Sequence, residues 1–313
     1  MSQRIFISGG TGAVGRYVID ELLTRTDDDL VVLVRAHSPV PPLLRNHPRL
    51  TTVVGDIAAG AELATRLPPV DRAVLLATSW GPMADAVNLD GTSALVDGLR
   101  ERGVQHVVWF GTASIIAYGG EALPDAVTHG TPYIRTKALS RERLLRLHTE
   151  ALTIVHPTLV VAGGNGLPES HLTRLLHEIE QRGWLARWIS GEGSFHVVHA
   201  EDLARLVRQL VVRHPSDVPR EIVAGTPSVT IDEMLALLLE RAGRQRGAAV
   251  QLTPRRIEWL IRLFRLRLSE WDRRCLAARH FTYRDATLTL DPNDGPRYAT
   301  ARAVMAAIPR RHA

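Results

Sequence analysis

A glycine-rich segment close to the N-terminus constrains the fold of this chain more than any other feature. It reads Ser8-Gly9-Gly10-Thr11-Gly12-Ala13-Val14-Gly15 and follows an apolar run that begins at Ile5. Glycines at this spacing let the backbone turn sharply from a strand into a helix, and they let a pyrophosphate approach the helix N-terminus. We therefore expect a strand-turn-helix unit that binds a dinucleotide, rather than a tight turn without a ligand.

The first half of the chain alternates short apolar runs with amphipathic stretches. The apolar runs are Ile5–Ser8, Leu30–Val34, Thr51–Val54, Ala73–Ala77, Val107–Phe110 and Leu152–Val155. The helical patterns between them include Val14–Thr24, Met83–Arg102 and Tyr133–His148. This alternation is typical of α/β proteins, and it predicts a doubly wound parallel Rossmann sheet of six strands with helices on both faces.

The pattern changes after about residue 165. A helical stretch at Leu172–Arg182 precedes a short strand, Phe195–Val198, which we expect to return to the sheet edge, and a helix at Ala200–Val212. The remainder reads as helices and loops. We predict a cofactor-binding Rossmann domain made of residues 1–165 and about 195–225. A smaller, mainly helical substrate-binding lobe is predicted from about 166–194 and 226–313.

Charge adds a constraint on the partners. The 313 residues carry 38 Lys and Arg against 33 Asp and Glu, a net charge of +5 at pH 7, and the pI is 9.9. This excess suits an acidic ligand such as a phosphorylated cofactor, although an arginine-rich composition alone gives the same charge. No basic motif interleaved with aromatic residues is present, so we expect a small-molecule substrate and no nucleic acid.

Cysteine usage and hydropathy predict a cytoplasmic protein. The single cysteine, Cys275, has no partner for an internal disulfide,. The first strand-like run begins at Arg4, so no signal peptide is expected. No run of 18 apolar residues exists, so no stable membrane insertion is expected. The spacing of cysteine and histidine predicts no metal site.

The end of the second predicted strand bears on the choice of cofactor. NAD-binding proteins carry an acidic residue there for the ribose 2′-hydroxyl, whereas this chain has Arg35,. Arg16, just after the third glycine of the motif, is a second candidate for the same place. A guanidinium pairs bidentately with a phosphate. The two arginines therefore favour NADP (NADPH), with NAD as the alternative.

Tyr133 and Lys137 form a candidate catalytic pair. A spacing of four residues puts both side chains on one helical face. A nearby ammonium stabilises a phenolate and lowers the pKa of the tyrosine, which suits proton exchange near neutral pH. Lys137 is also the only lysine beside 37 arginines, so it marks a position where arginine would not serve.

Together, these motifs resemble those of the extended short-chain dehydrogenases/reductases, which include NDP-sugar epimerases, dehydratases and carbonyl reductases. Ser8–Gly15 resembles the TGxxGxxG pattern of that family, and Tyr133 and Lys137 match its YxxxK pattern. The other matching segments are Gly55-Asp56-Ile57, Asp71 with Leu76-Ala77, Asn88-Leu89-Asp90-Gly91-Thr92, and Ala113–Gly119, which resembles SSxxVYG. The resemblance is good over about residues 4–165, moderate over Phe195–Ala204 and loose beyond Gly225.

The resemblance implies roles for particular residues. Ser114 would orient the substrate oxygen and Tyr133 would exchange its proton. Lys137 would hold the nicotinamide ribose, and Asn88 would support that lysine through water. The implied cofactor site consists of Gly9, Gly10, Thr11, Gly12, Ala13, Val14, Gly15, Arg16, Arg35, Asp56, Ile57, Ala77, Thr78, Tyr133, Lys137 and Pro157. The implied substrate contacts are Trp80, Ser114 and Ile115. The family also implies a homodimer through the helices at 83–102 and 133–148.

Departures from the sugar-nucleotide enzymes narrow the expected substrate. Ile115-Ile116 stand where the dehydratases carry Asp-Glu, and His156-Pro157-Thr158-Leu159 lacks the asparagine of the sugar-binding members. We therefore expect an NADPH-dependent oxidoreductase that transfers hydride to or from the carbonyl or alcohol of a relatively apolar small molecule. An NDP-sugar epimerase with the same Ser-Tyr-Lys set is the alternative. A non-catalytic NADP-binding sensor is a third interpretation.

One stretch of the predicted lobe is both amphipathic and basic. A helix expected at about 257–271 has an apolar stripe made of Ile257, Leu260, Ile261, Phe264, Leu268 and Trp271,. The arginines around it are Arg256, Arg262, Arg265, Arg267, Arg273 and Arg274. We expect this stripe to pack on the Rossmann domain. A substrate lid and a membrane-surface face are the alternatives.

Overall fold

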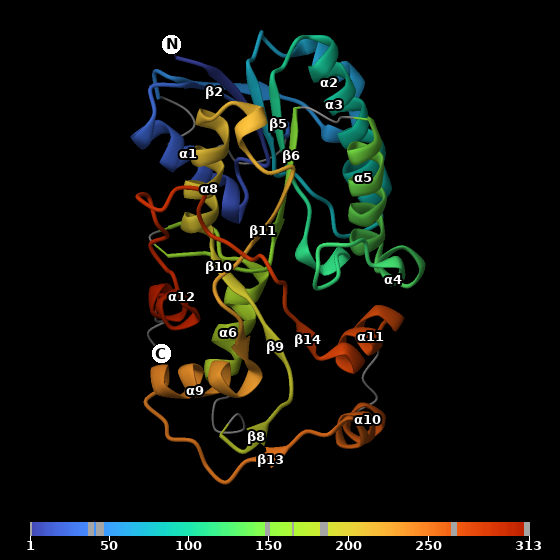
Figure 1. Ribbon diagram of the computed structural model, residues 1–313, viewed down its shortest axis with the longest axis vertical. Coiled ribbons are helices and arrows are strands. Elements are labelled where there is room, and N and C mark those ends of the chain that lie inside the picture. The colour runs from blue at the N-terminus through green and yellow to red at the C-terminus, as the bar shows by residue number, and fades with distance from the viewer. Residues whose placement is uncertain are drawn as a thin grey trace.

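The protein is built on a seven-stranded parallel sheet (Figure 1), seen in a computed structural model that describes residues 2–36, 41, 47–147, 151–164, 166–181, 187–263 and 268–309. The strand order is β11-β6-β5-β4-β1-β2-β3. The strands are β1 (Arg4–Ser8), β2 (Asp29–Val34), β3 (Leu50–Val54), β4 (Arg72–Leu75), β5 (His106–Phe110), β6 (Leu152–Pro157) and β11 (Glu221–Ala224). The order reverses between β1 and β4, which is where doubly wound sheets bind their ligands. The predicted doubly wound Rossmann fold is confirmed.

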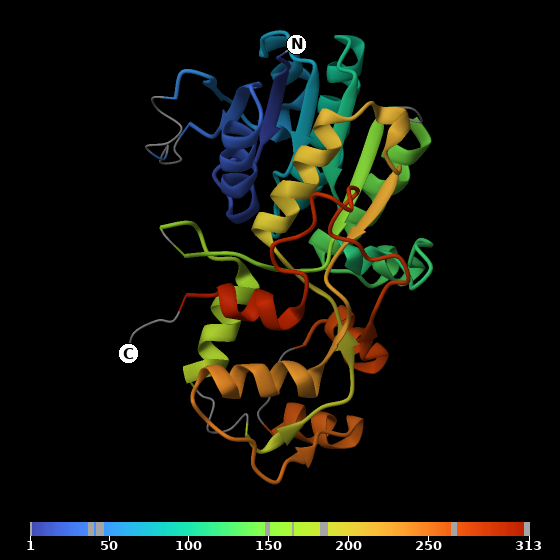
Figure 2. The same cartoon turned by 60° about the vertical axis from the view of Figure 1, so that its left-hand side comes forward.

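Helices cover both faces of the sheet (Figure 2). One face carries α1 (Ala13–Arg25) and α8 (Ala200–Val212), and the other carries α2 (Gly60–Arg66), α3 (Thr92–Glu101) and α5 (Pro132–Leu147). Successive side chains of a strand point to opposite faces. Ile7 therefore packs in the layer under α1 and α8, whereas Phe6 packs in the layer under α2 and α3.

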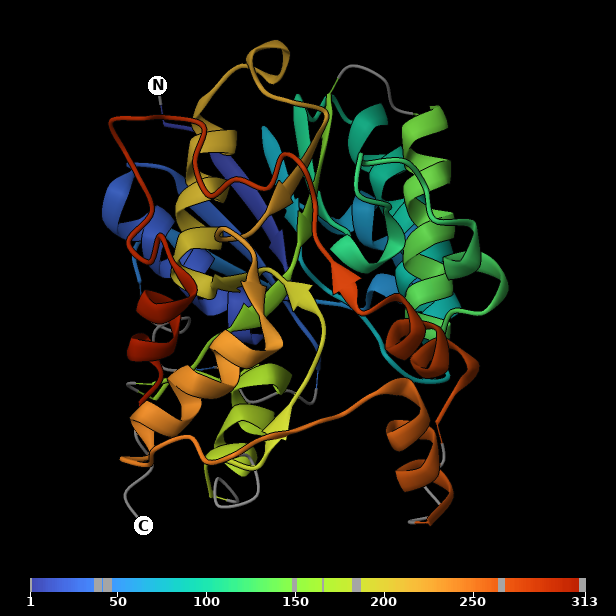
Figure 3. The ribbon, with the colours of Figure 1, turned by 60° about the horizontal axis from the view of Figure 1, so that its bottom comes forward.

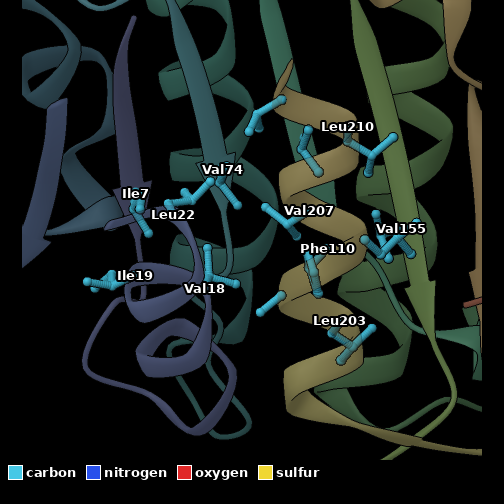
Figure 4. Packing of buried hydrophobic residues seen from close by; sticks show 14 of the residues in the cluster. Ile7, Val18, Ile19, Leu22, Val74, Phe110, Val155, Leu203, Val207 and Leu210 are labelled. Carbon is cyan, nitrogen blue, oxygen red and sulfur yellow. The ribbon is translucent and has the colours of Figure 1, made fainter. Parts of the chain in front are cut away.

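The apolar layer under α1 and α8 packs the two helices against the sheet (Figure 4). Its labelled residues are Ile7, Val74, Phe110 and Val155 from the sheet, Val18, Ile19 and Leu22 from α1, and Leu203, Val207 and Leu210 from α8. Strands that are buried on both faces need apolar residues at every position. This requirement explains why the buried strands were recognisable as mostly apolar runs, whereas β3 at the sheet edge is partly exposed.

The second lobe lies beyond the carboxyl ends of the strands (Figures 1 and 2). Its helices are α6 (His171–Gln181), α9 (Ile231–Arg241), α10 (Pro254–Leu263), α11 (Glu270–Ala278) and α12 (Ala301–Ala307). Its short strands are β7 (Leu159–Val161), β8 (Ile189–Ser190), β9 (Ser194–Phe195), β10 (Val197–His199), β12 (Val229–Thr230), β13 (Val250–Gln251) and β14 (His280–Phe281). The remaining short helices of the described chain are η2 (Ile57–Ala59), η3 (Asp85–Gly91, π-helical), η4 (Ala113–Ile115), α4 (Pro124–Thr128) and η5 (Pro215–Asp217). Within the described ranges, no helix has the length and apolar character needed to cross a bilayer.

The strand predicted at Phe195–Val198 does not return to the edge of the main sheet. Instead, β9 pairs with β12 and β14, and β10 pairs with β7. The edge strand is β11, which pairs with β6. Only two of its four residues, Ile222 and Ala224, are buried. This strand was missed because a half-exposed strand of four residues gives a weak apolar signal. The predicted domain boundaries stay a prediction.

The continuous helix predicted at about 257–271 is wrong, because α10 ends at Leu263 and α11 begins after Ser269. The Ser269 hydroxyl accepts a bond from the Asp272 amide at 3.1 Å, and the Asp272 carboxylate accepts one from the Ser269 amide at 2.9 Å. This capping box starts a new helix. Phe264, Arg265 and Arg267 lie outside the described residues, as do the side chains of Ile257, Leu260 and Ile261. Trp271 of α11 is buried.

A buried histidine at the amino end of β5 makes the stability of the fold depend on pH. His106 is fully buried beside Arg72 of β4, and its Nε2 lies 3.0 Å from the Thr153 hydroxyl oxygen. Burial and the Arg72 charge lower the pKa of His106 to about 4, whereas an unfolded histidine titrates at about pH 6.5. The stability that neutral His106 contributes is therefore present above pH 6.5 and is lost as the pH falls through 4.

We expect His106→Asn to be less stable than the wild type at pH 7.5, but to lose about 3 kcal/mol less between pH 6.5 and 4. Urea unfolding across this range measures the difference. His280→Asn is the matched control, because His280 is exposed and its loss should leave the pH dependence unchanged. Equal losses in the wild type and in His106→Asn would contradict the assignment.

Candidate active site

In the turn between β1 and α1, neighbouring backbone atoms come so close that only glycine fits at two positions. Gly9 has φ +73°, and a Cβ there would lie 2.7 Å from the Ala77 amide nitrogen. A Cβ at Gly15 would lie 2.2 Å from the Gly9 carbonyl oxygen. Gly12 is the N-cap of α1 and offers no side chain to the first amides of the helix. These amides are therefore free to bind an anion, and the turn fits the pyrophosphate of a dinucleotide.

The other predicted cofactor residues lie along the carboxyl edge of the sheet. Arg35 is exposed directly after β2, and Pro157 ends β6. Asp56 follows β3 and caps η2 by accepting a bond from the Ala58 amide at 2.9 Å. Arg16 has a buried Nε with no hydrogen-bond partner in the described part of the chain. The remaining members are Thr11, Ala13 and Val14 at the start of α1, Ile57, which is buried in η2, and Ala77 and Thr78 after β4.

Lys137 is buried in α5, and none of the described acidic side chains forms an ion pair with it. Its ammonium donates a hydrogen bond to the Phe110 carbonyl oxygen at 2.6 Å and lies 4.7 Å from the centroid of the Trp109 ring. Burial lowers the pKa of Lys137 to about 7. The lysine thus connects α5 to the end of β5.

Tyr133 lies one turn earlier on α5 and is also buried. Its ring stacks on that of Trp80, with centroids 3.8 Å apart and planes at 16°. Burial raises the pKa of Tyr133 to about 12, although a hydrogen bond from the Thr112 hydroxyl lowers it. The pKa was expected to be lowered by Lys137. The structure differs because burial of the phenol dominates and the ammonium bonds to Phe110 instead.

The loop after β5 carries two hydroxyl groups near Tyr133. Thr112 bonds to Tyr133 and accepts a bond from the Ser114 amide at 3.4 Å. Ser114 is partly exposed in η4, whereas Ile115 is 1% exposed and packs inside the apolar cluster beneath the site. Sequence reasoning singled out Ser114 and missed Thr112. The available signal was a hydroxyl residue two positions earlier, at the start of the same loop.

Asn88 is fully buried in η3, and its side chain is fully engaged. Its Oδ1 accepts bonds from the Thr78 hydroxyl at 3.0 Å and the Ser79 amide at 2.8 Å. Its Nδ2 donates to the Ser79 carbonyl at 2.8 Å and the Thr136 hydroxyl at 3.0 Å. Asn88 therefore ties the loop after β4 to α5. Its expected link to Lys137 through water stays a prediction.

The second lobe reaches the loop after β5 (Figure 3). The Tyr283 hydroxyl donates to the Ala113 carbonyl oxygen at 2.7 Å. Trp271 of α11 packs in the same buried cluster as Ala113 and Tyr133. Trp80 is 57% exposed, and its edge contacts His171 of α6, with ring centroids 5.4 Å apart. The surroundings of Tyr133 are therefore mainly apolar and aromatic.

Comparisons with known proteins agree with this arrangement. The NAD(P)H-binding family matches residues 9–172. A 3-beta-hydroxysteroid dehydrogenase from Mycolicibacterium neoaurum is 32% identical over 160 residues, which cover 45% of this chain and 42% of that protein. A sterol-4-alpha-carboxylate 3-dehydrogenase (decarboxylating) from Bos taurus is 24% identical over 204 residues, covering 61% and 55%. The chain thus spans about half the length of these two curated relatives.

A solved structure covers nearly the whole chain. The UDP-glucose 4-epimerase from Thermotoga maritima, with UDP-glucose, aligns over 97% of both chains with a TM-score of 0.68 and 17% identity. At this identity the similarity concerns the fold. The family match covers more than half of the chain. The protein therefore belongs to the NAD(P)H-binding family, and its cofactor is a nicotinamide dinucleotide.

Proposed function

We propose that this protein is an NADPH-dependent oxidoreductase that interconverts a carbonyl and an alcohol on a relatively apolar small molecule. One observation carries the proposal. Tyr133 and Lys137 are buried on α5 against the loop of Thr112 and Ser114, at the sheet edge that also holds the glycine turn. A bound nicotinamide would supply the hydride at this edge.

The protein groups around Tyr133 suit proton transfer. With a pKa of about 12, the phenol stays protonated at neutral pH, so it serves as the acid that protonates a carbonyl oxygen during reduction. The bond from the Thr112 hydroxyl stabilises the phenolate that remains. Ser114 lies on the same loop and is our candidate for orienting the substrate oxygen. The apolar surroundings exclude water and strengthen these interactions.

The substrate class follows from the surroundings of Tyr133. Trp80, which stacks on Tyr133, is 57% exposed and so presents apolar surface beside the site. The curated relatives are named for steroid and sterol substrates, so 3-hydroxysteroids and 3-ketosteroids are the first compounds to test. The epimerase alternative is favoured by the shared fold of a UDP-glucose enzyme, whereas Leu159 in place of the expected asparagine disfavours it.

The decisive test begins with protein purified and denatured without added cofactor, followed by quantification of any released nicotinamide. We expect an exchangeable site that binds NADPH and consumes it when a 3-ketosteroid is added. Stoichiometric, tightly held NAD⁺ would favour the epimerase, because its cofactor is regenerated within one turnover. Binding of NADPH without turnover of any carbonyl would favour the sensor. The expected homodimer stays a prediction.

The cofactor preference is tested at the end of β2. We expect Arg35→Ala to raise the Kd for NADPH about 10-fold and to leave the Kd for NADH unchanged, because the guanidinium pairs only with the 2′-phosphate. Fluorescence titration measures both constants. Arg25→Ala, an exposed arginine at the end of α1, is the matched control and should change neither. Equal loss of NADH affinity in Arg35→Ala would contradict the preference.

A further inference from the structure

Three side chains from different elements bond to the backbone at the end of β5 and in the loop that follows it. Its backbone carbonyls at Phe110, Thr112 and Ala113 accept bonds from Lys137, His156 and Tyr283 respectively. Lys137 comes from α5, His156 from β6 and Tyr283 from the second lobe. The first and third belong to the site described above. His156 has no assigned role, and it is the side chain that holds the residue bonded to Tyr133.

The His156 ring is enclosed between the loop and β11. It is 1% exposed, its Nδ1 lies 3.2 Å from the Thr112 carbonyl oxygen, and its Nε2 lies 2.9 Å from a carboxylate oxygen of Glu221. Gly111 makes space for the ring, because a Cβ at that position would lie 2.9 Å from Nδ1. The ring therefore has one place to sit and two fixed partners.

Glu221 is held in its charged form. Arg141 of α5 donates to both of its carboxylate oxygens, from Nε at 2.6 Å and from a terminal guanidinium nitrogen at 2.9 Å. Burial alone would raise the pKa of the Glu221 carboxyl, but the bonds from His156 and Arg141 lower it to about 2. An ionised carboxylate accepts hydrogen bonds and donates none.

The two partners of His156 fix the protonation of its ring. A backbone carbonyl and an ionised carboxylate are both acceptors, so both ring nitrogens must be donors. A ring that donates from both nitrogens is an imidazolium cation. In the hydrogen-bonded series Thr112, His156, Glu221 and Arg141, a neutral acceptor is thus followed by a cation, an anion and a second cation. Lys137, Tyr133 and Tyr283 also face this loop, but they bond to other atoms of it.

We propose that His156 is a positioning residue of the reaction: its doubly protonated ring, anchored through Glu221 to Arg141, fixes Thr112 and thereby the hydroxyl that bonds to Tyr133. The kinetic consequence rests on the proposed oxidoreductase function. The protonation state rests on the geometry alone. A purely structural role would change stability without changing how the reaction depends on pH, and this difference makes the proposal testable.

The first experiment measures the ring itself. Histidine ring ¹⁵N spectra of the cofactor-free wild type at pH 7.5 are compared with those of His156→Asn, so that the missing signals identify His156. We expect the assigned ring to have both nitrogens in the protonated range. A neutral His156 ring at pH 7.5 would overturn the proposal. The experiment uses no substrate, so its result is independent of whether the proposed function is correct.

The second experiment measures steady-state reduction with His156→Asn, Glu221→Gln and Glu221→Asp. We expect His156→Asn to lower kcat about 10–100-fold, within the range of one positioned proton-transfer group, with the KM for NADPH unchanged. Glu221→Gln should give a kcat that falls as the pH rises above about 6.5. The uncharged amide at position 221 no longer stabilises the second proton on the His156 ring. Glu221→Asp keeps the charge and should restore part of kcat and the flat profile.

His106→Asn is the matched control. His106 is as buried as His156, but it lies at the amino end of β5, whereas the loop that His156 contacts follows the carboxyl end. It should lower the thermal stability and leave kcat and its pH profile unchanged. NADPH binding, followed by fluorescence, confirms that each variant is folded. The proposal fails if His156→Asn and His106→Asn have the same kcat, or if Glu221→Gln keeps the pH profile of the wild type.

Discussion

Tyr133→Phe is expected to lower the turnover of a reducible carbonyl about 10²–10⁴-fold, the usual contribution of a positioned proton donor. The change removes one oxygen atom from a buried ring. The phenylalanine ring can still stack on Trp80, so the shape of the site is kept. The hydroxyl that donates the proton, and that Thr112 bonds to, is lost. Stopped-flow measurement of NADPH oxidation at saturating cofactor gives the rate directly.

Binding and folding should be unaffected by this change. We expect the Kd for NADPH to stay within about two-fold of the wild type, because the reacting proton contributes to the transition state and not to cofactor affinity. Tyr298→Phe is the matched control, since Tyr298 is a partly buried tyrosine whose ring contacts His199 and not Trp80. If Tyr133→Phe turns over at the rate of this control, another residue is the acid.

The sequence predicted the sheet well, because β1, β2, β4, β5 and β6 are mainly buried and so appear as mostly apolar runs,. All six predicted strands are present in the sheet. The seventh, β11, was missed because its half-exposed Glu221 begins a run of only four residues. The break between α10 and α11 was also missed. The capping box at Ser269 starts a new helix. The prediction relied on the spacing of apolar residues alone, and this spacing continues across the break.

The sequence could predict only those parts of the site whose residues lie within one short motif. The glycine turn and the Tyr133–Lys137 spacing are local, and the structure puts both at the carboxyl edge of the sheet. The chain from Thr112 through His156 to Glu221 joins residues 44 and 65 positions apart. No spacing rule connects such residues. The raised pKa of Tyr133 depends on how deeply the folded chain buries it, which no sequence pattern states.

Lys137→Met is expected to make the cofactor-free protein more stable at pH 6 by about 2–4 kcal/mol, while removing its activity. The wild type buries an ammonium whose partners, within the described ranges, are a single carbonyl and the face of Trp109. Its pKa is lowered to about 7, whereas an unfolded lysine titrates at about 10.4. The cost of burying the charge is therefore full below pH 7 and declines as the pH rises towards 10.4. Methionine has a similar volume and no such cost.

Thermal unfolding at pH 6 and pH 9.5 tests this sign, and we expect the gain of Lys137→Met to be smaller at the higher pH. Lys137→Arg is the informative comparison, because arginine is the cation that this chain uses everywhere else. A buried guanidinium has five donors, and among the described residues the Phe110 carbonyl is the only hydrogen-bond acceptor of Lys137,. We expect Lys137→Arg to be inactive and less stable than both the wild type and Lys137→Met. An active, stable Lys137→Arg would mean that charge alone is required at this position. The presence of one lysine beside 37 arginines would then have no physical explanation.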